Sequence, residues 1–334
     1  MLEPSLILVA LVVFVALVFD FVNGFHDAAN SVATIVSTRV LSPRAAVLWA
    51  AVFNFIAAFA FGTAVAKMVA TGVVHAHVVT IPVILAALLG AIVWDLITWW
   101  YGIPSSSSHA LIGAFAGAGV AAAGWQAVKF GGFGKIGAAI LVSPLLGLGC
   151  GWVLMKLVNC LMRNARPANV DHWFRRLQLV SAAIYSFSHG SNDAQKTMGI
   201  IMALLVAAGQ LAADAPVPLL VIFGCHLAIA LGTLCGGWRI VQTMGMRIVR
   251  LRPVDGFSAE TGGGVVILLM SHLGIPVSTT HTITGAITGV GVCRRFSAVR
   301  WWVARRIVWA WILTIPCSAL IAAGSYYLIQ WVTD

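Results

Sequence analysis

The sequence predicts an all-α polytopic membrane protein made of two inverted-topology repeats, each with a broken helix, spanning helices and a re-entrant helical hairpin. Composition is the first observation: 60% of the 334 residues are hydrophobic and 9% are charged, whereas average chains contain about 25% charged residues. The second is a set of long apolar runs with at most one charge each: 45–66, 136–162, 217–235 and 307–332. About 20 apolar residues suffice for a helix to cross a bilayer. The third is that two short motifs each occur twice along the chain.

The first apolar segment, 6–38, carries a polar stripe. Its polar residues recur at steps of three and four, which places them on one helical face: Asp20, Asn23, Asp27, Asn30 and Thr34. A buried carboxylate is costly in a membrane, so Asp27 is a candidate functional residue, unless it only makes a structural hydrogen bond to a neighbouring helix. Gly24 lies in the same stripe and predicts a break in the helix at mid-depth.

The second half of the chain repeats features of the first. Segment 190–196 follows the pattern of 24–30, and Asp193 stands 166 residues after Asp27. Two proline-containing segments are separated by 172 residues. Such a duplication is typical of secondary transporters. It divides the chain into a first inverted repeat, a cytoplasmic linker and a second inverted repeat, with the boundaries 1–162, 163–178 and 179–334.

Each proline segment predicts a break followed by a new helix. The first, 102–109, reads Gly-Ile-Pro-Ser-Ser-Ser-Ser-His, and the second, 274–281, reads Gly-Ile-Pro-Val-Ser-Thr-Thr-His. Proline suits a first helical turn, Ser and Thr cap its free N–H groups, and a helix N-terminus attracts anions. We call the two proline segments the hairpin tips. The candidate substrate-binding residues at these tips are Ser106, Ser107, Ser108, Ser278, Thr279 and Thr280. Capping or helix packing alone is the alternative role for these hydroxyls.

Loop charge predicts the topology. Arginine clusters between apolar segments fit cytoplasmic loops, so the net charge of +10 reflects topology and not a nucleic-acid partner: 163–176, 239–252 and 294–306. The segment around Pro276 lies between two of these loops and must return to the side it left. Its arms, 261–275 and 276–291, are shorter than the roughly 20 residues of a span, which predicts a re-entrant hairpin. Segment 81–101 is long enough for a full crossing. Both termini are predicted on the outer face.

Inverted repeats bring both tips and both aspartates to the membrane midplane. Hydroxyls, the amides of Asn30 and Asn192, and helix N-termini would surround a tetrahedral oxyanion with donors. Phosphate carries a P–OH group that donates to a carboxylate, whereas sulfate near neutral pH has none, so Asp27 and Asp193 favour phosphate. Alternatively, these carboxylates hold protons or cations that travel with the anion. Lys196 can share a face with Asp193, where it either neutralises the carboxylate or contacts the anion.

These motifs resemble those of the inorganic phosphate transporter (PiT) family, in particular the short bacterial low-affinity phosphate permeases. Besides the two tips, the segments that carry the resemblance are 23–30, 190–196, 236–240 and 252–256. The resemblance implies a secondary active transporter that imports inorganic phosphate by symport, as a homodimer in the cell (inner) membrane and without a cofactor. It also implies that Asp27, Asn30, Asn192 and Asp193, with the tip hydroxyls, form the substrate and coupling-ion site. Glu260 matches a family acid.

One departure from the family concerns the coupling ion. Many members have Asn immediately before the first Asp, where this chain has His26. Losing an amide oxygen weakens sodium coordination, and a His titrates near neutral pH, so protons are favoured over sodium. The candidate coupling-ion residues are His26, Asp27, Asp193, Lys196 and Glu260. Family likeness further suggests that neutral metal–phosphate complexes are carried, and no resident metal is expected.

Three other functions remain open from the residues alone. A symporter for another oxyanion, such as sulfate or arsenate, would use the same donors, and a passive anion channel would need no coupling ion. A membrane-embedded hydrolase would use Ser107 or Ser108 as nucleophile with a His as base. Both copies keep hydroxyls and His, and an enzyme rarely duplicates its nucleophile in inverted topology, so the hydrolase is the least favoured.

Overall fold

The computed structural model describes residues 6–59 and 62–333, and this part of the chain forms helices and no β-strand. The first half contains α1 (Leu6–Ser37), α2 (Pro43–Ile56), α3 (Ala64–Gly72), α4 (Ile81–Trp100), α5 (Ser107–Ala123) and α6 (Phe130–Leu161). The second half contains α7 (Pro167–Ala207), α8 (Leu219–Cys235), α9 (Trp238–Gln242), α10 (Pro253–His272), α11 (Thr279–Arg294) and α12 (Trp301–Thr333). Residues 60–61 of the predicted 45–66 helix lie outside the described residues. The predicted all-α class is confirmed.

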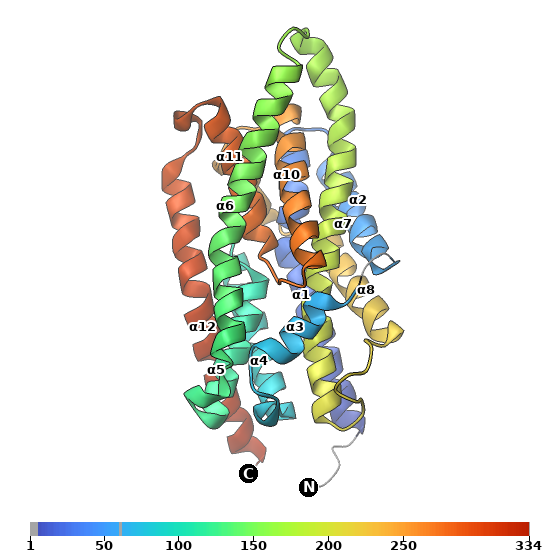
Figure 1. Ribbon diagram of the computed structural model, residues 1–334, viewed down its shortest axis with the longest axis vertical. Helices are drawn as coiled ribbons and strands as arrows, with labels where there is room; N and C mark the ends of the chain where they lie inside the picture. The colour runs from blue at the N-terminus through green and yellow to red at the C-terminus, as the bar shows by residue number, and fades with distance from the viewer. Residues whose placement is uncertain (1–5, 60–61, 334) are drawn as a thin grey trace.

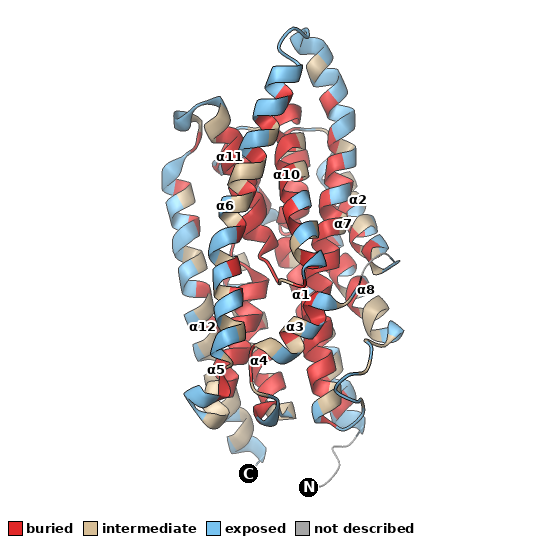
Figure 2. Ribbon diagram, viewed as in Figure 1, coloured by how far each residue is buried: buried red, intermediate tan, exposed pale blue. Residues whose placement is uncertain are grey.

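Apolar side chains cover the outside of the helix bundle. Leu141 and Leu145 on α6 are 71% and 67% exposed, and Leu320 on α12 is 74% exposed. The centre of the bundle is buried (Figure 2), and it contains many polar side chains. Among the described helices, α1, α4, α6 and α12 are long and apolar enough to cross a membrane, and the number is up to six if each of two bent helix pairs is counted as one span. The predicted polytopic membrane fold is confirmed.

The helix break predicted at Gly24 is absent, because α1 runs without interruption. Gly24 instead permits close packing against α8: a methyl group in its place would lie 2.1 Å from the carbonyl oxygen of Ile229. Small residues allow such backbone contact between membrane helices. Each half contains a broken helix elsewhere: between α2 and α3 in the first half, and between α8 and α9 in the second. At the second break the helix axis bends by 64°.

Two helices begin earlier than predicted. Helix α7 starts at Pro167, so most of the predicted linker 163–178 is helical. Helix α10 starts at Pro253 and has 20 residues, because Asp255 accepts a hydrogen bond from the Arg252 backbone N–H at 2.8 Å and caps this end. The first arm of the second hairpin is therefore long enough for a span. The length argument for a re-entrant hairpin was wrong, and the re-entrant course stays a prediction, which the buried tip described below supports.

The two hairpins enter the bundle from opposite ends. In Figure 1, α4 and α5 occupy the lower half of the molecule, whereas α10 and α11 occupy the upper half. The start of α1 and the end of α12 lie at the lower end, and the α6–α7 connection lies at the upper end. Inverted repeats require this arrangement. The inversion itself and the repeat boundaries stay predictions.

The second arm of each hairpin packs against the last helix of the other half. In α5, a methyl group on Gly117 would lie 2.4 Å from the carbonyl oxygen of Ala319 in α12. In α11, a methyl group on Gly285 would lie 2.1 Å from the carbonyl oxygen of Pro144 in α6. This exchange of partners ties the two halves together around the hairpin tips, through small-residue contacts.

Gly285→Ala is expected to lower stability by about 1–3 kcal/mol, because the added methyl group overpacks the α6–α11 contact. Thermal unfolding of the purified protein in detergent measures the change. The matched control is Gly149→Ala on α6, where nothing lies within 4 Å of the added methyl group. Equal melting temperatures for the two variants would contradict the close contact.

Candidate functional site

Glycine ends the first helix of each hairpin in the same way. Gly102 and Gly274 have φ angles of +63° and +69°, a conformation that suits glycine and ends helices. The next residue, Ile103 or Ile275, donates its backbone N–H to the carbonyl five residues earlier, at 2.9 Å in both hairpins. The repeated Gly-Ile-Pro sequence therefore produces the same turn twice.

A serine caps the second helix of each hairpin. The Ser106 hydroxyl accepts a hydrogen bond from the His109 backbone N–H at 3.3 Å, and the Ser278 hydroxyl accepts one from the His281 N–H at 3.2 Å. We predicted that these two hydroxyls bind substrate, but in this conformation each of them caps a helix. The hydroxyls left to face the interior are those of the next two residues in each tip.

The two tips meet inside the protein. The His109 and His281 rings lie 4.4 Å apart, centroid to centroid, and His281 stacks on Trp311 at 3.7 Å. Trp311 also donates its indole N–H to the Pro104 carbonyl oxygen at 3.1 Å. A single α12 side chain thus contacts both tips. Sequence reasoning missed Trp311, because nothing in the motifs around it distinguishes it from the other tryptophans.

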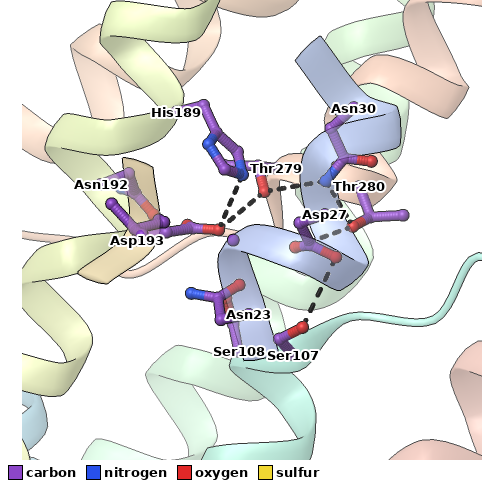
Figure 3. A network of polar contacts seen from close by, with 12 residues as sticks. Asn23, Asp27, Asn30, Ser107, Ser108, His189, Asn192, Asp193, Thr279 and Thr280 are labelled. Carbon is purple, nitrogen blue, oxygen red and sulfur yellow. Dashed lines mark hydrogen bonds and ion pairs between the residues drawn. The ribbon is translucent and has the colours of Figure 1, made fainter. Parts of the chain in front are cut away.

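Asp27 of α1 lies between the tips. Ser107 donates to one of its carboxylate oxygens at 3.5 Å, and Thr280 donates to the other at 3.4 Å (Figure 3). The His26 Nδ1 atom lies 2.6 Å from the first of these oxygens. Asn30, one turn further along α1, donates to the Thr280 hydroxyl at 2.8 Å. Hydroxyls of both hairpins therefore reach one carboxylate.

Asp193 of α7 lies on the other side of the same cluster. Thr279 donates to its Oδ2 atom at 3.1 Å, and the His189 Nε2 atom lies 3.3 Å from that oxygen. The Lys196 ammonium lies 2.5 Å from Oδ1. The two aspartates, the tip hydroxyls, Lys196 and the neighbouring histidines are each at most 4% exposed. The site is closed from both ends in this conformation.

Two predicted site residues make their hydrogen bonds elsewhere. Asn192 donates to the Ser271 hydroxyl of α10 at 2.7 Å. Glu260 accepts hydrogen bonds from Gln178, at 2.9 Å, and from Ser181. Both are buried polar groups within the bundle. The roles assigned to them in binding or coupling stay predictions.

The cluster also offers a set of ligand atoms for a cation. Asp27, His189 and Asp193 each offer one ligand atom, and these atoms lie within 4.8 Å of one another. Carboxylate oxygens and imidazole nitrogens bind both protons and divalent ions. His189 precedes Asp193 by four residues, which places the two side chains on one helical face.

The sequence is similar to those of several known proteins. A family model described as the phosphate transporter family matches residues 23–169 and 161–322. A protein of Rhizobium meliloti (strain 1021) named a probable low-affinity inorganic phosphate transporter is 56% identical over 94% of this chain and 94% of its own length. A protein of the same name in Bacillus subtilis (strain 168) is 46% identical over 97% of this chain and 98% of its own length.

A solved structure described as the sodium-dependent phosphate transporter is also similar. It matches with a TM-score of 0.89 and 26% identity, over 98% of this chain and all of that one. The relatives are named as transporters, so the hydrolase hypothesis is set aside and the chain is not an enzyme. The matches to the family model and to these relatives extend over nearly the whole sequence, and the chain belongs to the phosphate transporter family.

Proposed function

We propose that this chain imports inorganic phosphate by symport with protons at the cluster between the hairpin tips. One observation carries the proposal: hydroxyls from both hairpins donate hydrogen bonds to the carboxylates of Asp27 on α1 and Asp193 on α7. The names of the relatives support phosphate as the substrate. Because the cluster is closed, transport requires the tips to part toward one side of the membrane at a time.

Selectivity for phosphate follows from the carboxylates. An oxyanion between the tips would receive hydrogen bonds from Ser107, Thr279 and Thr280, which now donate to Asp27 and Asp193. The P–OH group of phosphate would donate to a carboxylate in return. Sulfate near neutral pH has no hydrogen to donate, so it would bring its oxygens against carboxylate oxygens without compensation.

Proton coupling is supported by His26. Its imidazole lies 2.6 Å from the Asp27 carboxylate, and the other ring nitrogen lies 3.0 Å from the Thr98 hydroxyl. A buried His–carboxylate pair can exchange a proton when the site opens. Sodium is the alternative, because the similar solved structure is described as sodium-dependent. A divalent ion carried with phosphate would fit the group formed by Asp27, His189 and Asp193.

We propose the same orientation and assembly as for the family. The basic connections would face the cytoplasm and both termini the outside of the cell membrane, in line with the positive-inside rule. The α6–α7 connection lies at one end of the molecule, and the start of α1 and the end of α12 lie at the other, as this orientation requires. A homodimer is proposed from the family resemblance.

Replacing either aspartate by its amide is expected to abolish phosphate accumulation. Asp27→Asn or Asp193→Asn keeps the side-chain shape but removes the charge and replaces one accepting carboxylate oxygen by an NH₂ donor, so uptake should fall about tenfold or more. Uptake of radiolabelled phosphate into proteoliposomes measures this. Asp171→Asn is the control, since Asp171 is half exposed and forms an ion pair with surface Arg175. Normal accumulation by both site variants would contradict the assignment.

Imposed ion gradients distinguish the coupling ion. A proton gradient should drive uptake by the wild-type protein, and a sodium gradient without a pH difference should not. His26→Asn removes the imidazole next to Asp27 and should weaken the proton-driven component. His77→Asn is its control, because His77 is exposed in a short 3₁₀ helix outside the cluster. Wild-type uptake driven by sodium alone would reverse the assignment.

Competition distinguishes phosphate from other oxyanions. Arsenate has the protonation states of phosphate and should inhibit uptake of labelled phosphate. An equal concentration of sulfate should leave the uptake rate unchanged, because it lacks the donor hydrogen. Strong inhibition by sulfate would instead indicate a general oxyanion symporter.

A further inference from the structure

Lys196 is buried among oxygen atoms from three separate elements. Its side chain is 2% exposed. The ammonium donates to the Asp193 carboxylate on α7 at 2.5 Å, to the Ser108 hydroxyl at the first tip, and to the Val277 backbone carbonyl at the second tip at 2.9 Å. An ammonium group has three N–H donors. All three are therefore used by protein oxygens, and none is left to contact an anion in this conformation.

The three acceptors resemble the ligands of a small metal cation. A carboxylate, a hydroxyl and a backbone carbonyl from a non-helical turn are hard oxygen ligands, which suit alkali and alkaline-earth ions. In transporters with interrupted helices, backbone carbonyls at such breaks coordinate coupling ions. If Lys196 only neutralised Asp193, a contact between the ammonium and the carboxylate would be enough. The ammonium also contacts one oxygen from each hairpin.

We propose that the Lys196 ammonium is a tethered cation that occupies an alkali-ion site between the two hairpin tips and locks them closed without a free ion. This inference rests on the proposed transport function. It explains why no sodium ion is needed at this position: the ammonium takes the place of the ion. The covalent link keeps the cation at the site through the whole cycle. The ammonium links both tips to Asp193 only in the closed state, so it favours closure as a bound ion would.

Removing the ammonium while leaving its ligands should create an empty ion site. Lys196→Ala keeps Asp193, Ser108 and the Val277 carbonyl, and frees space for a sodium ion. Lys196→Met removes the same charge but fills the space with an apolar side chain that offers no comparable ligand. The two variants thus separate loss of charge from creation of a site. Lys135→Ala, at an exposed lysine of α6, controls for a lysine substitution in general.

Phosphate uptake into proteoliposomes is measured with sodium or choline as the only added monovalent cation on both sides. The wild type and Lys135→Ala should show the same uptake in both salts. Lys196→Ala should lose about tenfold or more in choline and recover saturably with sodium. Lys196→Met should stay low in both. Equal activity of Lys196→Ala in choline and sodium, whether high or low, would overturn the proposal.

A second measurement does not depend on transport. Sodium should raise the melting temperature of Lys196→Ala in detergent relative to choline, and should leave the wild type and Lys196→Met unchanged. If the wild type takes up no phosphate, the proposed function fails, while this shift still tests the ion site. Lys196→Ser, which adds a hydroxyl ligand, replaces Lys196→Ala if the alanine variant does not fold. The absence of a sodium-specific shift in the folded small variant would refute the tethered cation.

Discussion

Hydrogen bonds between hydroxyls at two helix N-termini and two buried carboxylates hold the centre of this protein together. Ser107 and Thr280 reach Asp27 from opposite hairpins, and Thr279 reaches Asp193. The two hairpins enter the bundle from opposite ends, and the second helix of each packs closely against a long helix. Glycine residues allow this close packing of α5 against α12 and of α11 against α6. The architecture therefore serves to bring two helix ends to one place.

Burying two carboxylates in a membrane protein is costly unless partners compensate for the lost water. Here the compensation is local: His26 lies beside Asp27, and Lys196 and His189 lie beside Asp193. These partners differ in kind. A lysine carries its ammonium on a flexible, covalently attached stem, whereas a histidine gains and loses a proton near neutral pH. In our proposals, therefore, Lys196 provides a fixed cation and His26 provides the exchangeable one.

Sequence predicted the features that depend on local signals. The Gly-Ile-Pro turns, their serine caps and the duplicated Asp motif are short patterns with direct conformational consequences, and the structure contains both turns and both caps. Features set by packing were missed. Gly24 indicated a break, but its role is contact with Ile229 from a distant helix. Asn192 matched the motif, yet its amide turns to Ser271. Trp311 bridges the tips through contacts that no local pattern encodes.

A structure of the protein with phosphate bound tests the central claim most directly. Our account predicts that the anion lies between the N-termini of α5 and α11, within hydrogen-bonding distance of hydroxyls from both tips and of at least one of Asp27 and Asp193. Phosphate bound to one tip only, with the carboxylates out of reach, would contradict it. So would phosphate bound only in the cavity of about 440 Å³ lined by Lys67 and Asp214, away from the tips.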